Sequence, residues 1–221
     1  MDTAAAPASL TRLAYERLRH DVLEAELKPG QKLLMHELRT RYAAGASPLR
    51  EALSRLTMEG LVVHHEQRGF AVADASDAQL RDLVRTRIAV ESSALAQAMA
   101  QPTPAWEEQL VLAFHRLSRA TRSLQPDHYE ENPQWERLHR AFHFALLQGS
   151  ESPLLLGFCE QLYDQAYRYR QLAARSAYPM RNELDEHRAI FDAVMARRTE
   201  DAQRLMAEHY ERTARLIRQA E

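Results

Sequence analysis

Four histidines in the second half of the chain have the residue type and spacing of a metal site: His139, His143, His187 and His209. His139 and His143 are four residues apart, so on a helix they share one face and could bind a single ion. His187 and His209 lie in two later segments, and a bundle of those helices would let all four rings point inward. Imidazole nitrogens are ligands for Zn, Ni, Cu and Fe(II). Because the chain holds 10 histidines, an ordinary surface or core role for the pair stays open.

The segments that would position these histidines all have helical periodicity. Leu, Ala, Arg and Glu are plentiful and Gly is scarce, which favours helix. Thr103-Pro104 and Ser152-Pro153 fit helix starts, since proline at the first helical position loses no hydrogen bond. The predicted helices are 77–101, 104–124, 131–149, 153–176, 180–197 and 199–219. We therefore predict an all-α bundle over residues 77–219.

The first part of the chain has a different order of elements. A predicted helix over 10–25 ends at a Lys28-Pro29-Gly30 turn, and further helices follow at about 36–43 and from Ser47 to Gly60. Two strands, at 61–65 and 70–73, are joined by a turn that ends at Gly69. This order predicts a winged helix-turn-helix over 10–74 with a two-stranded wing, in a chain that is mainly α. Residues 1–9 are small and polar, and we expect a disordered tail there.

A winged helix-turn-helix suggests binding to double-stranded DNA, with its third helix in the major groove. Arg50, in the first turn of that helix, could reach guanine O6 and N7 or a phosphate. Ser47 is expected to cap the helix and Pro48 to follow it in the first turn. Ser47 and the amides at this helix start suit a phosphate. Arg55 on the same helix and Arg68-Gly69 at the wing tip are further candidates. From pattern alone, the same residues could be the solvated surface of a small module.

The composition sets few limits on partners. The chain has 29 Lys and Arg against 31 Asp and Glu, a formal net charge of −2, but DNA binding needs only one basic face. No apolar stretch is long enough to cross a membrane and no signal peptide is visible, so we expect a cytoplasmic protein. The single cysteine, Cys159, excludes an internal disulfide and is expected to be a core thiol.

The first part resembles the GntR family of bacterial regulators. The stretch "LKPGQKLLMHELRTRY…SPLREALSRLTMEGLVVHHEQRGFAVA" is similar to the family's Pro-Gly turn, its E-L, its P-V-R-E-A-L-x-x-L-x-x-x-G-L-V helix and its R-G-x-x-V wing. The family often has arginine two residues before the proline, where this chain has Ala46, so that DNA contact is expected to be absent. His36 stands where some members have a DNA-contacting arginine, and is either a weaker contact or a capping residue.

The second part resembles the FCD effector domain of FadR-type members, through "LVRTRIAVESSALAQAMA", "LHRAFHFALLQGSESPLL" and "DEHRAIFDAVMARRTEDAQRLMAEHY". Many such domains bind a divalent metal through an Asp or Asn and three histidines. The resemblance places His143, His187 and His209 on the histidine positions and His139 on the carboxylate or amide position, as a ligand or as a residue behind one. Zinc is the first choice of metal, with nickel and iron as alternatives.

The resemblance also implies a small carboxylate effector that completes the metal's shell, and a homodimer on a palindromic operator. Arg87, in the family's R-x-x-x-E pattern with Glu91, is a candidate anchor for the carboxylate; a buried ion pair between the two is the alternative. Stretches such as "FCEQLYDQAYRYRQLA" resemble the carbon-starvation-induced subgroup, whose effector is reported as the dicarboxylate glutarate.

Three functions remain in competition. The first is a ligand-controlled repressor, and the second is a sensor for which the metal itself is the signal. The third is a metal-dependent enzyme, which needs a general base beside the metal. We expect no enzyme, because Glu136, Glu186 and Glu208 neighbour the histidines in sequence but should point elsewhere on their helices.

Overall fold

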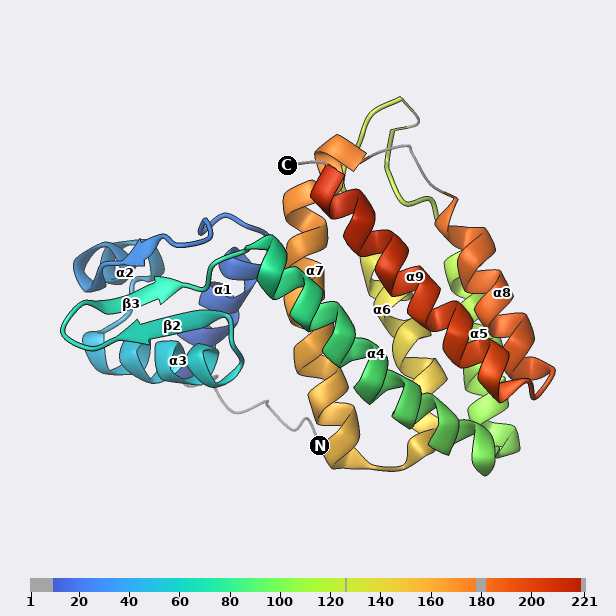
Figure 1. Ribbon diagram of the computed structural model, residues 1–221. Coiled ribbons are helices and arrows are strands. Elements are labelled where there is room, and N and C mark those ends of the chain that lie inside the picture. Colours follow the sequence, from blue (N-terminus) through green and yellow to red (C-terminus); the bar gives the residue numbers. More distant parts are fainter. Residues whose placement is uncertain (1–9, 126, 178–181, 220–221) are drawn as a thin grey trace, which may run out of the picture. The chain divides into compact units, whose positions relative to one another are not determined.

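The computed structural model describes residues 10–125, 127–177 and 182–219, without the side chains of 174–177. The expected tail at 1–9 lies outside these ranges. The chain divides into two compact units at the boundary between Ser76 and Asp77, and each is described by itself (Figure 1). No helix among the described residues is both long and apolar enough to cross a membrane.

The N-terminal unit is a winged helix-turn-helix, which confirms the fold class predicted for it. Its helices and strands, in chain order, are α1 (Leu10–Leu23), β1 (Lys32–Leu33), α2 (Met35–Tyr42), α3 (Ala46–Met58), β2 (Val62–His65) and β3 (Gly69–Val72). The wing has a third strand that the sequence did not predict. β1 pairs antiparallel with β3, Lys32 opposite Ala71, so the strand order is β1-β3-β2.

Helix α3 is held by its apolar face and by the way it ends. Leu49, Leu53 and Leu56 are fully buried, and α3 packs on α1. At its end, Gly60 has φ +73°, while the Leu61 amide donates to the Leu56 carbonyl and the Gly60 amide donates to that of Thr57. This is a Schellman motif, and it needs the left-handed conformation that glycine adopts without strain.

The start of α3 differs from the prediction. The helix begins at Ala46 with Gly45 as its N-cap, and no side chain caps it. Ser47 therefore lies inside the first turn, and the expected cap by its hydroxyl is wrong. Pro48 remains in the first turn, where a missing amide proton breaks no intrahelical bond.

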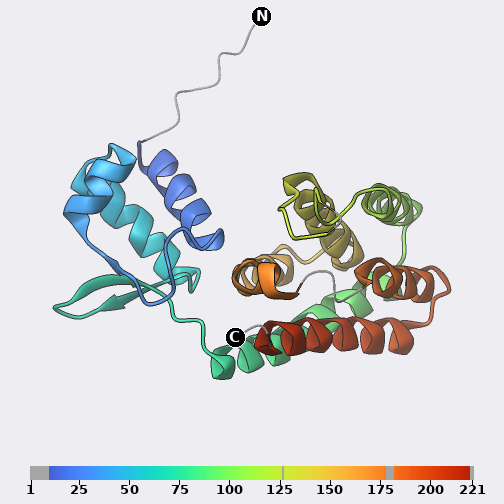
Figure 2. The same cartoon turned by 90° about the horizontal axis from the view of Figure 1, so that it is seen from above.

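The C-terminal unit is a helical bundle, as predicted. Its helices are α4 (Asp77–Ala100), α5 (Pro104–Ser118), α6 (Pro133–Leu147), the short η1 (Gln148–Ser150), α7 (Pro153–Ala177), α8 (Glu183–Met195) and α9 (Thr199–Gln219). Helix α4 packs on α7 and α9, α5 on α6, and α8 on α9; Figure 2 shows α4 and α9 side by side. Helix α5 ends at Ser118 and not near 124, because the chain then forms a loop bridged by Ser123 and Glu131.

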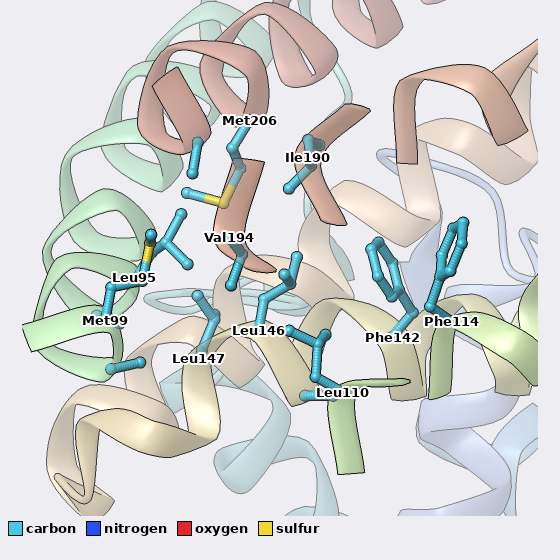
Figure 3. Close-up of a cluster of buried hydrophobic side chains, with 14 of the residues drawn as sticks. Leu95, Met99, Leu110, Phe114, Phe142, Leu146, Leu147, Ile190, Val194 and Met206 are labelled. Atoms are coloured by element: carbon cyan, nitrogen blue, oxygen red, sulfur yellow. The ribbon is translucent and has the colours of Figure 1, made fainter. Parts of the chain in front are cut away.

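The core of the bundle fixes the helices that carry the histidines. Phe142 and Leu146 of α6, Ile190 of α8 and Met206 of α9 have no exposed surface and meet in one cluster (Figure 3). Cys159 belongs to this cluster, and burial raises the pKa of its thiol to about 12. The cysteine is therefore the core thiol that the sequence predicted.

Candidate metal centre and DNA-binding surface

The bundle brings the four predicted histidines together at one point. His139 and His143 come from α6, His187 from α8 and His209 from α9, and all four are buried. One ring nitrogen from each lies within 4.8 Å of the others. The ring centroids of His139 and His187 are 5.0 Å apart and those of His187 and His209 are 4.7 Å apart. This set is the histidine cluster.

Residues behind the rings fix which nitrogen faces the centre. His209 Nδ1 donates to Glu186 Oε2 at 2.9 Å, since a carboxylate can only accept. The Tyr210 hydroxyl donates to Glu91 and lies 3.5 Å from His143 Nδ1, so that nitrogen carries the proton. Such partners hold metal-binding imidazoles in one tautomer and leave Nε2 as the ligand.

His139 is held by a tyrosine of α7. Its Nδ1 lies 2.9 Å from the Tyr163 hydroxyl on α7. Its Nε2 faces His143 Nε2 at 3.1 Å, so both Nε2 atoms point to the same place. In the structure, His139 Nε2 is thus one of the ring nitrogens that converge. The sequence left open whether His139 is a ligand or a residue behind a ligand.

The cluster favours uncharged imidazoles. Burial, followed by the charges of the neighbouring histidines and arginines, lowers the pKa of His139 and of His143 well below the usual value. A neutral ring has a lone pair free for a metal, and a protonated one does not. Four buried imidazole nitrogens suit Zn²⁺, Ni²⁺ or Fe²⁺ and do not suit Ca²⁺ or Mg²⁺, which take oxygen ligands.

Arg87 lies beside the cluster in an ion pair. Its Nε and Nη2 donate to the two carboxylate oxygens of Glu91 at 2.7 and 3.3 Å, and its guanidinium lies 4.0 Å from the centre of the Tyr210 ring. This is the buried Arg87–Glu91 pair that the sequence left as the alternative to an effector anchor. The pair also reaches the histidine cluster, because Glu91 accepts from Tyr210 behind His143.

A small cavity borders the cluster. It has a free volume of about 20 Å³ and its walls include Arg87, His139, His143, Arg170 and His209. This volume holds about one water molecule. A ligand larger than water must therefore displace side chains or move helices, which would couple its binding to the shape of the bundle.

Three of the candidate DNA-binding residues on α2 and α3 are exposed. His36 is exposed at the start of α2, and Ser47 and Arg50 are exposed in the first turns of α3, with Pro48 half-buried between them. Within the described ranges Arg50 makes no ion pair or hydrogen bond. An exposed arginine at this place is available to a base edge or a phosphate.

Arg55 and the wing residues differ from Arg50. Arg55 donates to Glu59 at 3.3 Å, and its guanidinium lies over the Tyr15 ring at 3.7 Å, so it braces α1 against α3. Arg68 is exposed in the turn between β2 and β3. Gly69 has φ +80° and open space where a Cβ atom would lie, and Gln67 is also in the left-handed region.

Sequence reasoning missed the partners behind the cluster. Glu186 was expected to point away from the histidines, and this was wrong. It directly precedes His187 on α8, and its carboxylate accepts a hydrogen bond from His209 of α9. Tyr210 carries no spacing signal, since its contact with Glu91 arises from α9 packing on α4. The pairing of Arg87 with Glu91, four residues apart, was visible in the sequence.

Comparison with known proteins matches both units to family models. Residues 10–72 match the model "Bacterial regulatory proteins, gntR family", and residues 82–212 match that of the FCD domain. The chain belongs to the GntR family, with an FCD domain. Both matches agree with the resemblance seen in the sequence.

Full-length relatives support the same conclusion. The chain is 37% identical over 211 residues to an uncharacterized HTH-type transcriptional regulator, BphR, of Paraburkholderia xenovorans, covering 96% of this chain and 86% of the relative. It is 34% identical over 210 residues to the HTH-type transcriptional repressor GlaR of Escherichia coli, covering 93% and 94%. The solved structure of E. coli McbR/YncC has a TM-score of 0.74 at 25% identity, covering 96% and 98%. This GntR protein is thus a DNA-binding transcription regulator and not an enzyme.

Proposed function

We propose that this GntR protein is a repressor whose operator binding is controlled by a small carboxylate bound beside a divalent metal. Residues 10–74 would bind the operator, and residues 77–219 would bind the metal and the effector. The single observation that carries the proposal is the buried histidine cluster, in which four side chains from three helices converge within 4.8 Å. We infer that zinc is the ion, with nickel or iron as alternatives.

The charge of such a site explains why an acid would bind there. Four neutral imidazoles leave the full charge of a bound divalent ion uncompensated by its ligands. When bound, the ion supplies positive charge and open coordination positions for a carboxylate oxygen. Glu186 and Glu91 lie behind the rings and hold the ligands in place. Arg87 lines the same cavity and stays a candidate effector contact, although Glu91 already takes two of its donors.

We propose that a homodimer binds the operator. One recognition helix reads too few base pairs for specificity in a genome, and a two-fold dimer doubles the site. We propose that Arg50 contacts a base or phosphate and that His36, Ser47, Pro48, Arg68 and Gly69 line the interface. We assign Arg55 a bracing role, because Glu59 and Tyr15 already hold its guanidinium.

A thermal-shift screen of small carboxylic acids tests the sensing half. An acid at 100 times its Kd stabilises the folded protein by about 2.7 kcal/mol, which raises the melting temperature by about 5–10 °C in a unit of this size. We expect this shift with metal bound and its loss when a chelator is added. A shift of equal size in the chelated protein would contradict a role for the metal. Release of DNA by metal alone, without acid, would favour the metal sensor.

A further inference from the structure

The histidine cluster needs a route to solvent. All four rings are buried, and the cavity beside them has a free volume of about 20 Å³. A hydrated ion or an organic molecule therefore enters only if part of the protein moves. Helices α4, α6, α7 and α9 supply most of the cavity wall. The remaining wall residue is Glu183, the first residue of α8, and it is held by a loop.

The loop between α5 and α6 is fastened to this part of the wall. Arg122 Nη1 lies 3.0 Å from Glu183 Oε1, and the two side chains are 21% and 12% exposed. The Arg122 guanidinium also lies 5.8 Å from the centre of the Trp135 ring. Trp135 lines the cavity and stacks on His139, with 4.6 Å between ring centroids. One loop side chain therefore reaches two residues of the cavity wall.

The loop forms a unit of its own. Its described residues are 119–125 and 127–132. The Ser123 hydroxyl makes hydrogen bonds to three backbone groups of the same loop. At the base of the loop, Asn132 Nδ2 donates to the Thr121 carbonyl at 2.7 Å. Because its two ends are joined, the loop can move as one piece.

The loop buries little of its own surface. Among its described residues only Ser123 is buried, and Leu124 is 55% exposed. Glu131 provides a second fastening to the bundle, because it accepts from the Tyr167 hydroxyl at 3.5 Å and from Gln171 Nε2 at 3.2 Å on α7. A segment that buries so little opens at a lower free-energy cost than helices packed through an apolar core. Figure 1 shows the loop at the end of the bundle where α8 begins.

We propose that the α5–α6 loop is a flap over the cavity beside the histidine cluster, and that the Arg122–Glu183 ion pair is its latch. Opening of the latch frees the flap and lets a metal ion or an effector pass. The inference rests on the proposed function for what passes, whereas access to the cavity can be measured without metal. Neither latch residue belongs to the histidine cluster, and the latch closes over the empty and the filled cavity alike. It therefore sets the rates of entry and exit and leaves the affinity unchanged.

Exchange of bound zinc into a coloured chelator measures the latch in the full-length protein. Arg122→Gln and Glu183→Gln should each speed zinc release and zinc uptake by the same factor, about 3- to 10-fold, the effect of one partly buried ion pair. The equilibrium affinity for zinc should not change. The double variant should be no faster than either single variant, because all three lose the same contact. The exchanged pair, Arg122→Glu with Glu183→Arg, should restore slow exchange.

The metal-free protein gives a second reading that does not depend on the proposed function. Diethyl pyrocarbonate acylates neutral imidazoles, and it reaches a buried ring only when the structure opens. We expect His139 and His187 to be acylated about 3- to 10-fold faster in Arg122→Gln than in the wild type at pH 7, because the rate follows the population of the open form. Peptide mass spectrometry would measure the rates. His115, which is exposed on α5, is the internal control and should react equally fast in both proteins.

Glu107→Gln is the matched control variant. Glu107 lies in the first turn of α5, at the opposite end of that helix from the flap, and pairs with Arg197 just after α8. The variant therefore loses an ion pair of the same bundle without touching the latch. It should leave zinc exchange and acylation unchanged. If it speeds both as much as the latch variants do, general loosening of the bundle opens the cavity and the flap is wrong.

The outcomes separate the flap from the proposed function. Unchanged zinc exchange and acylation in both latch variants would overturn the flap and leave the metal site standing. A changed zinc affinity with an unchanged rate of uptake, or an exchanged pair that stays fast, would overturn the latch. If the wild type binds no metal, the proposed function fails and the acylation rates alone decide on the flap. Should Arg122→Gln not fold, Glu183→Gln decides.

Discussion

His139 gives the proposed metal site its distinctive charge. A carboxylate at this position would cancel one unit of the ion's charge, whereas an imidazole cancels none. The ring is buried, and its Nε2 meets that of His143 at 3.1 Å. A divalent ion bound here would therefore keep more positive charge for an anionic effector than it would with a carboxylate at this position.

Removing single ligands should separate sensing from DNA binding. We expect His143→Ala and His187→Ala each to lose bound metal by at least about 10-fold in affinity, because every ligand contributes to the site. Both variants should lose the response to acid and keep operator binding. Metal content by mass spectrometry and DNA binding by fluorescence anisotropy would measure this. His115→Ala, an exposed change on α5, is the control, and a metal-loaded His187→Ala would refute the assignment.

Arg50 and Arg55 form a matched pair on one helix. Arg50→Ala should weaken operator binding by about 1–3 kcal/mol, roughly 5- to 150-fold, because an exposed arginine loses its contact with a base or phosphate. Arg55→Ala should have a much smaller effect on DNA and should lower stability instead, since Arg55 contacts Tyr15 and Glu59. Anisotropy and urea denaturation of both variants would test this, and equal operator affinities for Arg50→Ala and wild type would remove Arg50 from the interface.

At the scale of elements, α6 matters most to the site because it carries two of the four histidines. Its start is fixed by Asn132, whose side chain accepts from the amides of Gln134 and Trp135 and donates to the Thr121 carbonyl. The cap joins the helix to the loop that precedes it. If α6 frayed from this end, His139 would be displaced earlier than His143.

Replacing the Asn132 cap should destabilise α6, which carries two of the proposed ligands, without changing a ligand itself. Asn132→Ala is expected to lower the free energy of unfolding of the C-terminal unit by about 1 kcal/mol, the usual cost of a lost N-cap. Asn132→Asp keeps an acceptor for the helix amides and should cost less. Denaturation curves of both variants, with and without metal, would show the difference; equal stability of Asn132→Ala and wild type would contradict the role of the cap.

Helix periodicity and proline starts predicted most of the elements. α9 is found over 199–219 as expected, because its apolar face repeats regularly and acidic residues mark its first turn. The strand β1 was missed because it has two residues and exists only through pairing with β3. The start of α3 was misplaced because backbone geometry at Gly45, and not a side chain, begins the helix.

The candidate site was predictable in part, because helix periodicity also places the histidines. Histidines four residues apart on one helix are visible in a sequence, and His187 and His209 lie on later predicted helices of the same bundle. The partners Glu186 and Tyr210 were not predictable, because contacts across α4, α8 and α9 depend on how the helices rotate in the bundle.

For the whole molecule, the histidine cluster makes stability depend on pH when metal is removed. The pKa of His139 and of His143 is lowered in the folded protein, so both rings stay neutral there while the unfolded chain takes up protons below about pH 6.5. The unfolded state then binds more protons, and stability falls as the pH falls from that value.

The expected slope is up to about 1.4 kcal/mol per pH unit for each histidine. Urea denaturation of the metal-free protein at pH 7, 6 and 5 would measure it. The double variant His139→Gln, His143→Gln should lose this part of the slope. Identical pH profiles for the variant and the wild type would show that the two rings are not held neutral by the fold.

The central claim is that an acid bound at the metal in one unit controls DNA binding by the other. The most direct measurement is the affinity of the metal-loaded protein for a labelled DNA fragment from upstream of its own gene, titrated with the acid that stabilises it most. We predict that the acid weakens DNA binding at least about 10-fold, a coupling of about 1.4 kcal/mol, and that it has no effect after chelation or in His187→Ala. An acid that binds the protein at the metal but leaves the DNA affinity unchanged would contradict the account.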